Sequence, residues 1–252
     1  MKLIKVLFNY IKWSLRIWAL SFLGIIILAG LYMFYNDSIY YRKNDEAIAS
    51  LKKEGWGLQT ISSNGKEVMN YARIRENSPN FDFWLFIPDT PVSLPVMYKT
   101  NDDMFYRTHD CYNETTPGGT PFVDPSCSAD LDDQVSVIYG VDADGDRLFS
   151  CLFDYVYDKN FAKEHDTLTV VCKDSKRQYR FVAAYVDDSQ EKLPTKFDSA
   201  TAYAEFLNTA ISKMEYRHAS SIDMRKNSLI LANCYPSGGI GRTYVVIFQP
   251  IS

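Results

Sequence analysis

The sequence predicts a mostly β domain carried on a single membrane-spanning helix. Two observations predict this class: a series of short β-branched and aromatic segments separated by turn residues, and one long uncharged apolar segment near the amino terminus. A third observation refines it, because one amphipathic helix interrupts the strands shortly before the last two. Short strands in such a series indicate a barrel or a sandwich.

The composition narrows the class of function. The 252 residues, 46% hydrophobic and 15% aromatic, suffice for one core-bearing domain with an appendage. A net charge of -4 leaves no basic surface of the kind that binds nucleic acid, so we exclude that partner. The five cysteines contain no C-x-x-C pair, which argues against a zinc site and a dense disulfide framework. We expect no metal and no cofactor, and we leave open a pairing of Cys111 with Cys127.

The apolar segment from Ile17 to Tyr35 is long enough to cross a hydrocarbon core about 30 Å thick. Four basic residues precede it, which by the positive-inside rule predicts a cytoplasmic amino end: Lys2, Lys5, Lys12 and Arg16. A cleaved signal peptide is the alternative, but the apolar run is longer than a usual signal core and no small-x-small cleavage site follows it. We therefore expect a cytoplasmic tail over 1–16, an anchor over 17–35 and an extracellular remainder.

A helical stalk is predicted over 36–78, with short helices at Asn44–Lys53 and Lys66–Arg75, and the β domain over 79–252. Asp198 or Ser199 can cap the amphipathic helix, which runs to Met214. The strands are expected at 81–88, 92–98, 120–124, 134–139, 167–172, 178–185, 228–234 and 243–248.

The last two strands flank a Pro/Gly-rich turn and bring two reactive groups together. Cys234 ends the first of these strands and Arg242 enters the second, which predicts a thiol and a guanidinium at one rim of a sheet. A cation near a cysteine lowers the thiol pKa and so favours the nucleophilic thiolate. The alternative is a buried structural cysteine beside a surface arginine.

Several segments, in order and at matching spacing, resemble one family from about Asn80 to Phe248. These are Asn80–Thr90, Pro95–Asp102, Phe105–His109, Gly119–Asp124, Val137–Gly140, the helix Asp198–Met214, and Asn233-Cys234 with Arg242. Together with the anchor they resemble the class B sortases, the membrane-anchored cysteine transpeptidases of Gram-positive bacteria. The resemblance implies a closed β-barrel of about eight strands, with helices at its amino end and the long helix before the last two strands.

The resemblance also implies roles for individual residues. Cys234 would be the nucleophile, and Arg242 would clamp the oxyanion or the substrate. Tyr98, Thr108, Val141 and Asn233 would contact the substrate. The partners would be secreted proteins with a carboxyl-terminal sorting motif, and a cell-wall precursor or pilin amine that accepts them.

One residue departs from the family pattern in a way that affects the chemistry. Where the family has Gly-His, this chain has Gly140-Val141, and valine cannot transfer a proton. His109, in a segment that borders the substrate groove of the resembled proteins, is a candidate substitute acid, whereas His165 and His218 are expected in surface loops. Three functions are therefore weighed: an active transpeptidase with an unusual acid, an inactive sortase-fold protein that binds a sorting motif or partner at the membrane, and a surface β domain that keeps only the fold.

Overall fold

A computed structural model describes residues 2–56, 69–100, 105–116, 118–143, 147–189, 191–216, 222–234 and 242–251. For residues 2–9, 11, 36, 37, 40, 56, 142, 143 and 234 it describes the backbone and not the side chain. The chain divides into two compact units, Met1–Lys43 and Asn44–Ser252. Each unit is therefore described by itself.

The amino-terminal unit is helical throughout its described length. Helix α1 (Lys2–Trp56) begins in it and continues into the second unit. Its segment Lys12–Tyr35 has a mean hydropathy of 2.2, so it is long and apolar enough to cross a membrane. This segment contains the predicted anchor.

The second unit begins with the last part of α1 and a short helix. Residues 44–53, predicted as a separate helix, belong to α1, and they bury Leu51. Helix α2 (Tyr71–Asn77) starts later than predicted because the side chain of Asn70 accepts a hydrogen bond from the Arg73 N–H and so caps it there. Residues 66–68 of the predicted helix lie outside the described residues.

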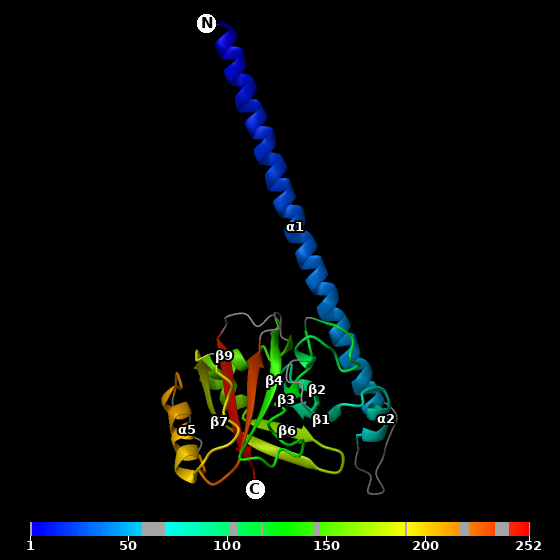
Figure 1. Cartoon of the computed structure of the whole chain (residues 1–252), viewed down its shortest axis with the longest axis vertical. Helices are drawn as coiled ribbons and strands as arrows, with labels where there is room; N and C mark the ends of the chain where they lie inside the picture. The colour runs from blue at the N-terminus through cyan, green and yellow to red at the C-terminus, as the bar shows by residue number, and fades with distance from the viewer. Residues whose placement is uncertain are drawn as a thin grey trace. The chain divides into compact units, whose positions relative to one another are not determined.

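Eight strands close into a barrel. They follow the spatial order β3-β2-β1-β6-β7-β9-β8-β4, and β3 also pairs with β4, which closes the ring. Their bounds are β1 (Phe81–Phe86), β2 (Ser93–Met97), β3 (Phe122–Val123), β4 (Val135–Ala143), β6 (Thr167–Val171), β7 (Lys176–Asp187), β8 (Ser228–Cys234) and β9 (Thr243–Pro250). A further two-residue strand, β5 (Arg147–Leu148), pairs with the end of β4. The predicted closed barrel is confirmed (Figure 1).

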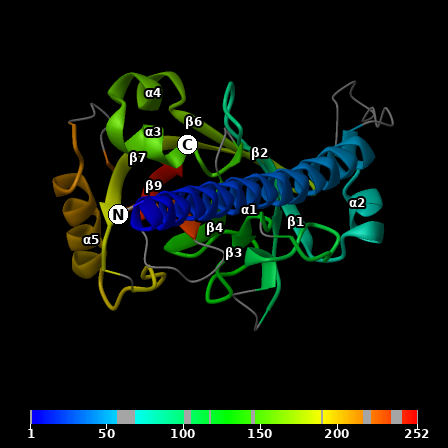
Figure 2. The same ribbon diagram turned by 90° about the horizontal axis from the view of Figure 1, so that it is seen from above.

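Two short helices after β5 were not predicted. α3 (Leu152–Tyr157) and α4 (Lys159–Glu164) lie together in Figure 2, and α3 packs against β7 and β9. Residues 161–164, expected in a surface turn before His165, therefore belong to a helix. The Asp158 side chain accepts from two backbone N–H groups of α4 and caps it. Each helix has under two turns, which is too short for a helical period to show in the sequence.

Helix α5 (Ala200–Ser212) is the predicted amphipathic helix, and Ser199 caps it. Tyr203, Leu207 and Ala210, spaced by four and three residues, form its buried face. They pack on side chains of β4, β7, β8 and β9, among them Val137, Tyr185, Ile230, Ala232 and Val245. This packing fixes the strands that carry the candidate site.

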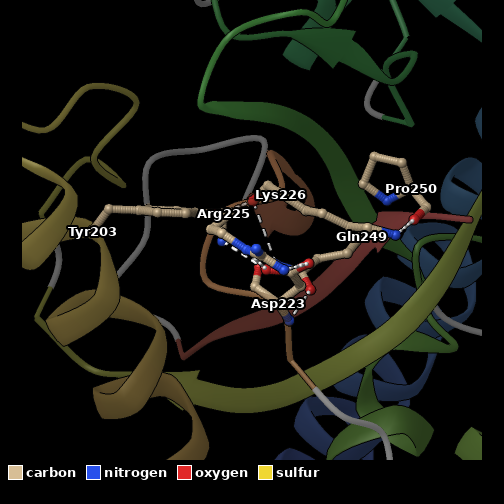
Figure 3. A network of polar contacts seen from close by, with 6 residues as sticks. All are labelled: Tyr203, Asp223, Arg225, Lys226, Gln249 and Pro250. Carbon is tan, nitrogen blue, oxygen red and sulfur yellow. Dashed lines mark hydrogen bonds and ion pairs between the residues drawn. The ribbon is translucent and has the colours of Figure 1, made fainter. Parts of the chain in front are cut away.

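A polar network joins the loop before β8 to β9 (Figure 3). The buried side-chain amide of Gln249 donates to the Asp223 carbonyl at 2.9 Å and accepts from the Asp223 N–H at 3.1 Å. The Tyr203 hydroxyl donates to the Lys226 carbonyl, which ties α5 to the same loop. This end of β8 is therefore held by side-chain contacts to backbone groups.

Candidate active site

The strand register gathers the candidate residues at one rim of the barrel. Val141 of β4 stands opposite Cys234 of β8 in a parallel ladder. Thr243 of β9 stands opposite Asp187 of β7. The antiparallel register of β8 and β9, Ala232 opposite Val245, leads two residues further on to Cys234 beside Thr243. Adjacent strands lie about 4.8 Å apart, so the backbones of Cys234 and Arg242 are close neighbours.

Arg242 is held from the strand on its other side. Its Nε lies 3.8 Å from Oδ1 of Asp188, the residue that follows β7. Both side chains are largely exposed, so this ion pair contributes little to stability. An exposed guanidinium at this rim can bind an oxyanion or a substrate carbonyl.

The side chain of Asn233 bonds to the backbone of Arg242 and Tyr244. It is 1% exposed, its Nδ2 donates to the Arg242 carbonyl at 3.3 Å, and its Oδ1 accepts from the Tyr244 N–H. Ile230 and Ala232 belong to the cluster under α5, and side chains alternate along a strand, so Asn233 faces the other side of the sheet. The role predicted for it, contact with a substrate, stays a prediction.

Val141 is also buried, at 1% exposure. Its carbonyl accepts a hydrogen bond from the Phe149 N–H at 3.2 Å, just after β5. The Phe149 ring also packs against Gly140, which precedes Val141. The apolar end of β4 thus fills the place beside the backbone of Cys234.

His109 lies in the segment that leads to β3, next to β4. The Thr120 hydroxyl, two residues before β3, donates to the His109 carbonyl. The imidazole stacks on Phe105 with centroids 3.9 Å apart, and Nδ1 lies 2.8 Å from the Phe105 carbonyl. That bond requires a proton on Nδ1, which leaves Nε2 as the nitrogen for acid–base chemistry. The half-buried ring is thereby fixed in orientation.

The remaining residues named from the sequence are Tyr98, Thr108 and the other two histidines. The Tyr98 hydroxyl donates to the Cys127 carbonyl at 3.1 Å, and Thr108 Oγ1 lies 3.2 Å from His109 Nδ1. Thr108 and His109 therefore adjoin each other, as expected from the sequence. His165 Nδ1 lies 2.9 Å from the Pro88 carbonyl, away from the β8 rim. His218 lies outside the described residues.

Of the remaining cysteines, Cys111, Cys127 and Cys151 are buried and Cys172 is half-buried. Cys111, Cys127, Cys151 and Cys172 are free thiols, so the pairing of Cys111 with Cys127 that we left open does not occur. The Ser78 hydroxyl donates a hydrogen bond to the Cys111 carbonyl, whereas the Cys127 thiol donates to the Val135 carbonyl. Burial raises the pKa of Cys127 to about 11, and it raises the pKa values of Cys111 and Cys172. None of these three thiols resembles a nucleophile.

A cavity of about 470 Å³ opens at the other end of β8. Its lining includes Arg177, Tyr179, Asn227, Leu229 and Pro250, and Arg177 is paired with Asp132 at 2.8 Å. Because it adjoins the start of β8, the length of that strand separates it from Cys234. Among the described side chains, no three His, Cys, Asp or Glu groups gather as metal ligands would.

No protein-family model matches the sequence. Sortase B of Listeria monocytogenes is 22% identical over 224 residues, which cover 85% of this chain and 90% of the relative. The Staphylococcus aureus sortase B–substrate complex superposes with a TM-score of 0.74 at 19% identity, over 85% of this chain and 99% of that one. Sortase B of Clostridium perfringens gives 0.62 at 23% identity, over 71% and 97%.

The chain has the class B sortase fold. The resemblance deduced from the sequence is thus confirmed by a curated relative and by solved structures. Within this sortase fold, the β8–β9 rim carries Cys234 and Arg242. Asp188 was missed by the sequence analysis, because an acidic residue in an Asp-Asp-Ser turn gives no sign that its neighbour is an arginine more than fifty residues away.

Proposed function

We propose that this protein is a membrane-anchored cysteine transpeptidase of the sortase B type. The proposed substrates are secreted proteins with a carboxyl-terminal sorting motif, which it would join to a cell-wall precursor or pilin amine. The observation that supports the proposal is that Cys234 ends β8 and Arg242 immediately precedes the adjacent strand β9, at one rim of a sortase B fold.

In the proposed reaction the Cys234 thiolate attacks a backbone carbonyl carbon of the motif. Arg242 stabilises the oxyanion that forms on that carbonyl. The C–N bond then breaks, a thioester remains on Cys234, and the leaving amine takes up one proton. The acceptor amine attacks the thioester, loses a proton and releases the thiolate. The proton given to the leaving amine is recovered from the acceptor amine, so one acid–base group can serve both steps.

The identity of that acid–base group is the open chemical question. We infer that Val141 occupies the position of the family's histidine. Its side chain has no ionisable group and is buried, so it cannot transfer a proton to a substrate. His109 is the candidate substitute, because its Nε2 is available and its segment adjoins β4. Direct transfer needs heavy atoms about 3 Å apart, so His109 would have to reach back over the end of β4.

A second function is favoured by the same residue. The burial of Val141 suits a protein that keeps the rim and has lost proton transfer, and that binds a sorting motif or a partner at the membrane without cleaving it. General acid–base catalysis contributes about 10²- to 10⁴-fold, so its loss would leave little turnover.

The test is cleavage of a panel of sorting-motif peptides, with an amine acceptor, by the full chain in detergent. We expect turnover that disappears in Cys234→Ala and persists in Cys172→Ala, a matched variant of another thiol at a strand end. His109→Ala should then lower turnover by about 10²-fold. Turnover in Cys234→Ala would refute the mechanism. Peptide binding without turnover, together with turnover gained in Val141→His, would establish the binding function instead.

A further inference from the structure

Asn233 connects the two halves of the proposed site. Its backbone pairs with Gly140 in the β4–β8 ladder, and the next residue in the chain is Cys234. Its side-chain amide reaches the opposite neighbour, β9, at Arg242 and Tyr244. A single buried residue therefore contacts both strands that flank β8 at this rim.

The two amide bonds follow a recognisable pattern. In a parallel ladder, one residue accepts with its carbonyl from the N–H that follows the partner residue and donates with its own N–H to the carbonyl that precedes that partner. The Asn233 amide makes the same two bonds around Thr243, with the carbonyl of residue 242 and the N–H of residue 244. The β8–β9 ladder runs as far as Ala232 and Val245, and the Asn233 amide adds two hydrogen bonds to β9 beyond it.

We propose that Asn233 is a positioning residue, whose amide clamps the main chain of Arg242 and so holds this arginine at the rim where β8 ends in Cys234. The inference rests on the proposed function. The Arg242 guanidinium forms its ion pair with Asp188, the residue after β7, so the backbone and the side chain of Arg242 contact residues on opposite sides of β9.

The side-chain chemistry explains why an amide suits this place. The clamp needs one donor and one acceptor on the same planar group, which asparagine has. Aspartate has no donor, and its charge would face the Arg242 carbonyl. A threonine hydroxyl would present one polar atom where the amide presents two. Gln249 uses its amide in the same way on Asp223, near the end of β9 (Figure 3).

The experiment measures alkylation of Cys234 by iodoacetamide across pH, resolved by peptide mass spectrometry, in the full chain in detergent. This readout reports the thiolate and needs no peptide turnover. Cys172 in the same sample is the internal reference. The variants are Asn233→Ala, Asn233→Asp, Arg242→Ala and the double variant Asn233→Ala with Arg242→Ala. The matched control is Asn227→Ala, since Asn227 Nδ2 also donates to a carbonyl, that of Asp132, beside the other end of β8.

If Asn233 acts through Arg242, both single alanine variants slow Cys234 alkylation near neutral pH by about three- to tenfold, with a matching shift of the pH profile. The double variant is then no slower than Arg242→Ala, because the clamp has nothing left to position. Asn233→Asp loses the donor to Arg242 and places a charge against its carbonyl, so its alkylation should be at least as slow as that of Asn233→Ala. Asn227→Ala should match the native chain.

Effects that multiply in the double variant would overturn the proposal, and so would an unchanged rate in Asn233→Ala. If Asn233→Ala does not fold, the same cycle with Asn233→Thr decides. Exchange of the Tyr244 amide hydrogen gives a second reading, because it should accelerate in Asn233→Ala and stay slow in Arg242→Ala. Peptide turnover is scored separately, so coupling without turnover would reject the proposed function while the clamp stands.

Discussion

Asp82 is the clearest case in which one residue sets a property of the whole fold. It lies in β1, mostly buried, and among the described residues its Oδ2 has no hydrogen-bond partner. Burial raises its pKa from 3.8 to about 6, against the opposing attraction of Arg75, and Asp130 raises it further. The folded protein therefore binds this proton more tightly than the unfolded chain does.

Asp82 predicts a pH dependence of stability. The free energy of unfolding should be highest below about pH 4, fall as the pH rises to about 6, and change little from this source above that. Asp82→Asn removes the decline, so at pH 7 it should stabilise the protein by up to about 3 kcal/mol. Urea denaturation at pH 4.5 and pH 7 measures this, with the exposed Asp174→Asn as control. An equal effect of Asp82→Asn at both pH values would contradict it.

At the scale of the element, the end of β4 depends on the absence of a side chain. A Cβ at residue 140 would lie 2.5 Å from Cδ2 of the Phe149 ring, which is fully buried. The glycine therefore lets the chain fold back after β5 with its ring against β4, beside Val141 and Asn233. A rigid ring in a packed core cannot move aside as the end of an aliphatic chain can.

Gly140→Ala should lower the free energy of unfolding by about 1 to 3 kcal/mol, because it overpacks this contact. Gly55→Ala is the matched comparison, since its nearest neighbour is Ile74 Cδ1 at 2.6 Å, the end of a flexible side chain in contact with a helix. Chemical denaturation of both variants measures the difference. The account of β4 would be wrong if the two alanines had the same cost.

At the scale of the whole molecule, the chain divides into two compact units, and helix α1 has residues in both. The unit Asn44–Ser252 contains the last turns of α1, and Leu51 and Ile74 are fully buried there. The barrel domain therefore packs onto helical residues that precede its first strand. The remaining part of α1 contains the apolar segment, which is exposed along its length.

We expect that apolar segment to span a membrane with the amino end in the cytoplasm, because basic residues precede it. In intact protoplasts, antibody should reach a tag at the carboxyl end and should not reach a tag at the amino end. Replacement of Lys2, Lys5, Lys12 and Arg16 by Gln should yield a mixture of orientations. Accessible amino-terminal tags in the native chain would contradict this topology.

Local patterns were sufficient to predict the regular parts of the protein. We could predict the apolar run before Tyr35 from its length and composition. We could predict the strands and the buried face of α5 around Leu207 because apolar residues recur with the period of each element. The closed barrel followed from the resemblance. Helices α3 and α4 could not be predicted, because each is too short to show a helical period. The Asp158 cap stabilises α4, and α3 packs on the sheet.

By itself, the sequence determined that a thiol and a guanidinium would flank one turn, because Cys234 and Arg242 are close along the chain. Only the tertiary structure decided what surrounds them. Asp188 lies beside Arg242 through the register of β7 and β9, and the end of β4 at Val141 is buried. The side chain of Asn233 faces the backbone of β9. The contacts of Asp188 and Val141 depend on pairings between strands distant in sequence, β7 with β9 and β4 with β8, which no local pattern specifies. The Asn233 contact spans only nine residues, but it depends on where the β8–β9 ladder ends.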